Sequence, residues 1–188
     1  MKLVPMKNIL KLKWASLAVL LFLAVSCDSD DPEPVNEEEL ISTAKLTFTP
    51  SGGGAAVVAT FQDFDGAGGN SPIITNPTLA ANTSYSVTVQ FLDETQNPSE
   101  DVTEEVEEEG VDHQFFFSSN ISGIEFDYTD TDINSKPIGI TSSLSTTNSG
   151  SGTITIVLRH MPDKNGENVS TGDITNAGGE TDIEVSYA

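Results

Sequence analysis

The sequence predicts an all-β domain, an antiparallel β-sandwich of about eight strands with at most one short helix. From Leu40 onward, short runs of residues alternate between apolar and polar side chains, the two-residue period of half-buried strands. Clusters of Gly, Pro, Asn, Asp and Ser separate these runs, as expected of turns. The strand and helix patterns do not alternate as a parallel sheet would require. Serial strands at this spacing favour two packed antiparallel sheets.

Each predicted strand is identified by the apolar residues that share one of its faces. In chain order these sets are Leu40/Ala44/Leu46/Phe48, Ala55/Val57/Ala59/Phe61, Tyr85/Val87/Val89/Phe91, residues 113–117 (HQFFF), Ile124/Phe126/Tyr128, Ile138/Ile140/Leu144, Ile154/Ile156/Leu158 and Ile183/Val185/Tyr187. The second run ends at the glycine-rich sequence DFDGAGGN.

The one predicted helix lies in the acidic sequence SEDVTEEVEEEG, residues 99–110. We expect Ser99 to be its N-cap and Gly110 to end it. Glutamates four residues apart would repel each other by a few tenths of a kcal/mol per pair. The sequence therefore predicts a marginal helix on a solvated acidic edge, and the alternative is a binding site for a cation or a basic partner.

The sequence LAANTSY, residues 79–85, resembles the tyrosine corner of fibronectin type III and immunoglobulin-like domains. Ala81 and Asn82 stand where that motif has Pro and Gly. The resemblance implies an immunoglobulin- or fibronectin III-like sandwich in which the hydroxyl of Tyr85 bonds to the connecting backbone.

Composition narrows the function classes. The 188 residues carry a net charge of −21, and all 29 acidic residues follow Ser26, whereas four of the eight basic residues precede it. Such a chain repels nucleic-acid phosphates, so we expect no nucleic-acid partner. Its single cysteine, Cys27, excludes an internal disulfide and a thiolate metal site.

Residues 1–26 are predicted to be a signal peptide, with lysines followed by a short apolar run that is too short to span a bilayer. An uncleaved single-pass anchor is the alternative. The sequence LAVSC, residues 23–27, resembles the lipobox of bacterial lipoproteins, although Ala24 replaces the usual leucine. The resemblance implies that Cys27 is lipidated and anchors the protein to a membrane.

Residues 27–39 are predicted to form an acidic, flexible tether, and residues 40–188 the sandwich. The acidic sequence DSDD after Cys27 is similar to the export signal of surface lipoproteins in Bacteroidetes. The whole chain resembles small acidic lipoproteins of that group, which implies a surface-exposed location on the cell outer membrane. The label "type 1 periplasmic binding fold" found among such relatives conflicts with these residues, because that fold needs two lobes of alternating strands and helices.

Calcium is the one cofactor that the sequence suggests. Carboxylate and amide oxygens on tight loops are calcium ligands, and two loops offer them: Asp63, Asp65 and Asn70 in the first, and Asp127, Asp130, Asp132 and Asn134 in the second. Neither loop has the full EF-hand pattern. The competing interpretation is that these side chains bond to the backbone of their own turns.

No catalytic motif is present in the sequence, and we expect no enzymatic activity. His113 and His160 lack a third histidine for a typical zinc site. Two functions remain: a non-catalytic envelope sandwich that binds a protein or glycan or has a structural role, and a small-ligand or calcium-binding protein that uses the acidic loops. A hydrolase dependent on His113 or His160 is a distant third.

Overall fold

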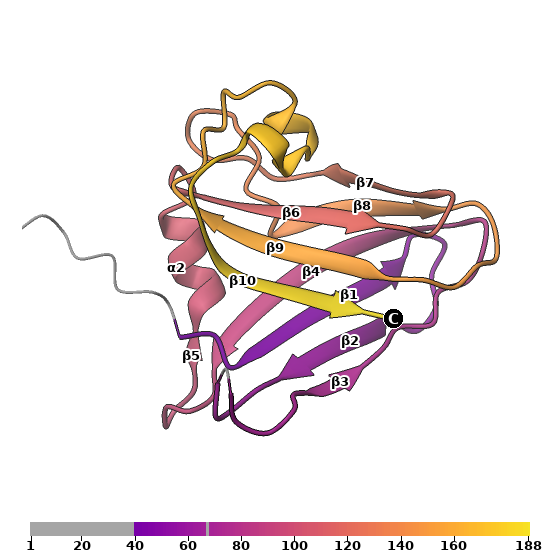
Figure 1. Ribbon diagram of the computed structural model, residues 1–188. Helices are drawn as coiled ribbons and strands as arrows, with labels where there is room; N and C mark the ends of the chain where they lie inside the picture. Colours follow the sequence, from indigo (N-terminus) through magenta and orange to yellow (C-terminus); the bar gives the residue numbers. More distant parts are fainter. Residues whose placement is uncertain (1–39, 67) are drawn as a thin grey trace, which may run out of the picture. The chain divides into compact units, whose positions relative to one another are not determined.

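The computed structural model describes residues 40–66 and 68–188, which form two antiparallel β-sheets (Figure 1). The all-β sandwich predicted from the sequence is thereby confirmed. The predicted signal peptide, Cys27 and the tether lie outside the described residues. Within the described ranges, no helix is both long enough and apolar enough to cross a membrane.

The larger sheet has seven strands and the smaller has three, whereas immunoglobulin constant domains pair sheets of four and three. The order in the larger sheet is β3 (Ile73–Thr75), β2 (Val57–Gln62), β1 (Thr43–Pro50), β4 (Thr83–Asp93), β8 (Thr141–Thr146) and β7 (Ile124–Tyr128), and β5 (Glu100–Asp101) pairs with β4. The order in the smaller sheet is β10 (Glu180–Tyr187), β9 (Ile154–His160) and β6 (His113–Ser119).

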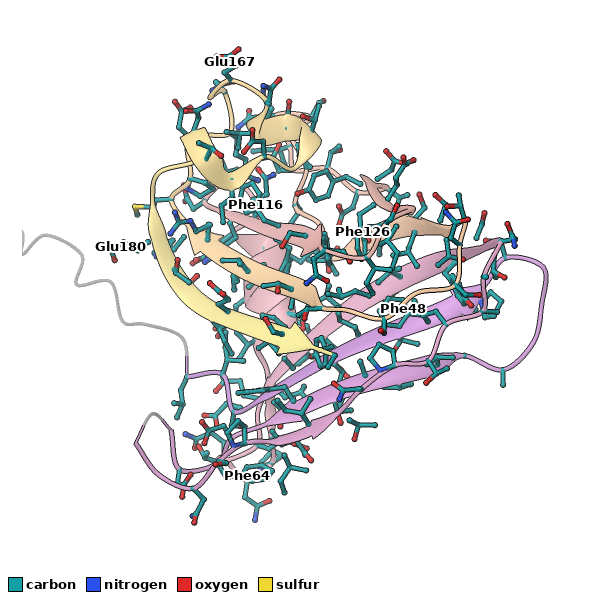
Figure 2. The ribbon with its side chains drawn as sticks, turned by 45° about the vertical axis from the view of Figure 1, so that its right-hand side comes forward. Phe48, Phe64, Phe116, Phe126, Glu167 and Glu180 are labelled. Atoms are coloured by element: carbon teal, nitrogen blue, oxygen red, sulfur yellow. The ribbon has the colours of Figure 1, made fainter. Side chains whose placement is uncertain are left out.

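The core lies between the inner faces of the two sheets. Alternate residues of β1, β4, β6 and β9 are buried there, as the two-residue period predicts. Phe91 of β4 and Phe115 of β6 meet edge to face across the sheets, with ring centroids 5.0 Å apart. Figure 2 labels Phe48 of β1 on the inner side of the larger sheet.

The strand prediction needs several corrections. The short strands β3 and β5 were not predicted, because neither is long enough to show a two-residue period. Leu40 and Ala55 are exposed and precede their strands. Ile138 and Ile140 precede β8 and accept hydrogen bonds from Phe115 and Val89 through their carbonyl oxygens, so this segment links the sheets before β8 begins.

The predicted helix forms, but it begins at a different residue. Helix α2 spans Val102–Glu108, and its N-cap is Asp101, whose carboxylate accepts the backbone N–H of Thr103. Ser99 is not the cap, because Glu100 and Asp101 first pair with β4 as strand β5. Val102 and Val106 are buried in the core. This packing stabilises a helix whose glutamates repel one another.

Part of the outer face of the smaller sheet is covered by the segment between β9 and β10. This segment contains two 3-10 turns, η1 (Val169–Thr171) and η2 (Ile174–Asn176). Val169 and Ala177 pack on Phe116 and Val157, which point away from the main core. Figure 2 labels Phe116 beneath this segment and Glu167 at its tip. The segment therefore buries the outer face of the smaller sheet around Phe116 and Val157, whereas Ser118, Glu184 and Ser186 stay exposed.

The tyrosine corner predicted from residues 79–85 is present. The hydroxyl oxygen of buried Tyr85 accepts a hydrogen bond from the backbone N–H of Ala80 at 2.7 Å. Asn82 has a φ of +50°, the left-handed conformation that glycine adopts in the motif. Asparagine tolerates this conformation, which explains how it can replace the glycine.

We expect Tyr85→Phe to lower the free energy of unfolding by about 1 kcal/mol, because the change removes one hydrogen bond and leaves the ring in place. Urea unfolding measures the difference. Asn82→Gly is the matched control, since glycine keeps the backbone conformation and should leave stability unchanged within about 0.5 kcal/mol. If Tyr85→Phe is as stable as the wild type, the bond between the Ala80 N–H and the Tyr85 hydroxyl contributes nothing net, because water can bind the freed N–H instead.

Candidate functional site

In the first acidic loop, the carboxylates bond to their own turn. Asp63 accepts the backbone N–H of Gly66 at 2.9 Å. Asp65 accepts the backbone N–H and the side-chain amide of Asn70, and these bonds hold the pKa of Asp65 below its usual value. The loop therefore has the internal bonds that the turn interpretation predicts.

The second acidic loop is bonded in the same way. Asp130 accepts the backbone N–H groups of Gly139 and Thr141, both at 2.8 Å. One carboxylate oxygen of Asp132 accepts the N–H groups of Asn134 and Lys136. Asp127 lies on β7, exposed and apart from these bonds.

Calcium binding at either loop stays a prediction. Among the described residues, no group of three or more His, Cys, Asp or Glu side chains is placed to hold a metal ion. Calcium would have to compete with the backbone N–H groups for the oxygens of Asp63, Asp65, Asp130 and Asp132.

Lys164 is a buried cation that links three connections of the fold. Its ammonium donates to the carbonyl oxygens of Gly110 and Pro137 and to the carboxylate of Asp132, the last at 3.0 Å. The Lys164 and Asp132 side chains are 5% and 1% exposed. Burial lowers the pKa of Lys164, and the carboxylate of Asp132 opposes that shift. Asp132 is one of the predicted calcium ligands, and one of its carboxylate oxygens pairs with this lysine.

The two histidines lie together at the same end of the smaller sheet as Lys164. The rings of His113 and His160 stack with centroids 4.8 Å apart and planes 8° apart. Nδ1 of His113 lies 3.2 Å from the carbonyl oxygen of Glu109. Burial is the main cause that lowers the pKa of His113, and His160 adds to it, whereas the Glu109 carbonyl opposes the shift.

We expect the unfolding free energy to fall as the pH is lowered through about 6.5, in part because of His113. Its pKa is lower in the folded protein than in the unfolded chain, so the unfolded chain binds more protons between the two values. His113→Phe keeps a ring against His160 and should reduce this pH dependence. Urea unfolding at a series of pH values measures both slopes, and identical slopes would contradict the assignment to His113.

A cavity of about 560 Å³ opens where the loops meet at the end of the sandwich drawn on the right in Figure 1. The β3–β4 connection, the β6–β7 loop, the β8–β9 loop and the end of β10 all contribute to it. The lining residues are Pro77, Thr78, Leu79, Ile121, Ile124, Gly150, Ser151, Gly152, Thr153, Ile154, Tyr187 and Ala188. This volume is typical of small-molecule sites.

Hydrogen bonds fix two of these loops to each other. Thr153 donates its backbone N–H to the side-chain oxygen of Asn120 at 2.7 Å, and its carbonyl oxygen accepts the hydroxyl of Ser119 at 3.0 Å. Gly152 permits this close approach, because a Cβ there would lie 2.8 Å from Ile121 Cγ1. These contacts hold the β6–β7 and β8–β9 loops together on this side of the pocket.

The floor of the pocket is apolar and belongs to the core. Ile154 and Tyr187 are buried at 3% and 1% exposure. The hydroxyl of Tyr187 donates to the carbonyl oxygen of Ala44 at 3.1 Å and thus points away from the pocket. Burial raises the pKa of Tyr187, so the phenol is neutral. The described lining residues include no Asp, Glu, His, Lys or Arg.

Neither this pocket nor the Lys164 site is predicted from the sequence. The lining residues come from segments that are far apart in the chain, and none of them carries a chemical motif. The one available signal for Lys164 is the scarcity of basic residues after Cys27. That part of the sequence has 29 acidic residues and only four basic ones, Lys45, Lys136, Arg159 and Lys164.

The fold and the pocket define the class of this protein as an all-β sandwich with a pocket between its loops whose described lining side chains carry no charge. No protein-family model, no curated protein and no solved structure matches the chain.

Proposed function

We propose that this protein is a lipid-anchored envelope protein whose β-sandwich has a non-catalytic binding role. The observation that supports the binding role is the cavity of about 560 Å³ between the loops, which we call the loop-end pocket. Its volume suits a small ligand, and its described lining side chains offer no acidic, basic or imidazole group for proton transfer or nucleophilic attack. Binding without chemical conversion is what such a lining supports.

The envelope location rests on the sequence of the first residues. The lipobox-like sequence at residues 23–27 supports lipidation of Cys27, and the aspartates that follow support export to the outer face of the outer membrane.

Replacing the anchor cysteine tests this location. We expect Cys27→Ala to move the protein from the membrane fraction to the soluble fraction, because the acyl chains have no other attachment point. Ser29→Ala, two residues further on, is the matched control and should stay with the membranes. Fractionation followed by immunoblotting measures both variants. A Cys27→Ala protein that remains membrane-bound would contradict the lipid anchor.

A further inference from the structure

The residues that line the loop-end pocket indicate the chemical class of its ligand as well as its size. An inference about that class rests on the proposed binding role. Five apolar side chains line it: Pro77 and Leu79 of the β3–β4 connection, Ile121 of the β6–β7 loop, and Ile124 and Ile154 at the first residues of β7 and β9. Burying an aliphatic group against this surface is favourable by about 25 cal/mol per Å². This lining therefore favours a ligand with an aliphatic body.

A charged ligand does not fit the lining. A buried charge needs an opposite charge or several hydrogen bonds, and the described lining side chains carry no charge. The net charge of −21 further disfavours anions. A zwitterion such as a free amino acid would leave two charges without partners.

The rim supplies hydrogen bonds without charge. Thr78 lies on the β3–β4 connection, and Ser151 and Thr153 lie on the β8–β9 loop. Within the described part of the chain, their hydroxyl groups have no hydrogen-bond partner. Each can donate to or accept from a neutral polar group. A ligand with one uncharged polar end would satisfy them while its body fills the apolar floor.

The only aromatic ring among the described lining residues belongs to Tyr187. Because this side chain is 1% exposed, its ring offers no face on which a flat ligand could stack. We infer that the pocket binds a small neutral amphiphile, an aliphatic chain or ring that ends in an alcohol, amide or ester group.

Photoaffinity labelling of the full chain in isolated membranes tests this inference. The probes are a medium-length alkyl alcohol that carries a diazirine, and matched versions with a carboxylate or a trimethylammonium group. Peptide mapping by mass spectrometry locates the label. We expect the alcohol to label peptides that contain Ile121, Ile124 or Ile154 in a saturable way, and the charged probes to label them weakly.

Ser151→Trp should abolish the saturable labelling, because indole fills the mouth of the pocket from an exposed position. Thr78→Trp blocks the same mouth from the opposite connection and is the second variant. Ser149→Trp is the matched control, since Ser149 is exposed in the same loop but does not line the pocket.

Two results would overturn the inference in different ways. If a charged probe labels the pocket as strongly as the alcohol does, the neutral ligand class is wrong and the proposed binding role stands. If no probe labels the pocket saturably, or if labelling persists in both tryptophan variants, the pocket is not the binding site. Membrane attachment through Cys27 is tested separately by fractionation.

Discussion

Lys164→Met is expected to lower the free energy of unfolding by about 3 to 5 kcal/mol, the cost of removing one partner from a buried ion pair. The ammonium of Lys164 donates to Gly110, Asp132 and Pro137, so its loss leaves two carbonyl oxygens and a carboxylate without their donor. Asp132 keeps its bonds to the backbone N–H groups of Asn134 and Lys136 but loses its counter-charge. Urea unfolding measures the loss.

Lys136→Met is the matched control for this prediction. Lys136 lies in the same loop as Asp132 but bonds to that carboxylate through its backbone N–H. We expect this variant to stay within about 0.5 kcal/mol of the wild type. The double variant Lys164→Met with Asp132→Asn should lose less than the sum of the two single variants, since the unpaired charge is gone. Additive losses would show that the ion pair itself contributes little.

The two-residue alternation predicted most of the strands, because a strand that buries one face has apolar side chains at every second position. Tyr85, Val87, Val89 and Phe91 are all buried on β4, as their spacing predicts. The tyrosine corner was predicted for a similar reason: its residues act on one another within a single short segment.

Features set by backbone pairing between distant segments could not be predicted in this way. Ser99 has the side chain of an N-cap, but β5 pairs with β4 and delays the start of the helix to Val102. The three residues of β3 are all exposed and too few to show alternation, although all three are β-branched, and their pairing with β2 defines the strand. Neither pairing leaves a periodic pattern in the sequence.

The candidate site was less predictable than the fold. Asp130 and Asp132 were correctly placed on one loop, yet nothing local indicated that Lys164 would lie beside them. The pocket is a property of the way loop ends meet, and its residues are ordinary Thr, Ser, Ile and Gly. A motif search detects charged and reactive groups, so it overlooks a site defined by the lack of them.

Gly139→Ala is expected to lower the free energy of unfolding by about 2 to 4 kcal/mol, because strain and overpacking act at the same position. Gly139 has a φ of +91° and lies where the two sheets meet. A Cβ there would be 2.9 Å from Phe115 Cβ and 2.9 Å from Tyr128 Cε1. Both neighbours are fixed, since the Tyr128 hydroxyl donates to the Phe115 carbonyl and the Phe115 N–H donates to Ile138, each at 2.7 Å.

Gly53→Ala separates the two causes. Gly53 has a similar φ of +86°, and a Cβ there would meet no atom within 4 Å. This variant therefore carries the backbone strain alone, about 1 to 2 kcal/mol. We expect Gly139→Ala to lose about 1 to 3 kcal/mol more than Gly53→Ala in urea unfolding. If the two losses are equal, β6 and β7 can move apart at no cost, and the bonds of Tyr128 and Phe115 do not hold the sheets together.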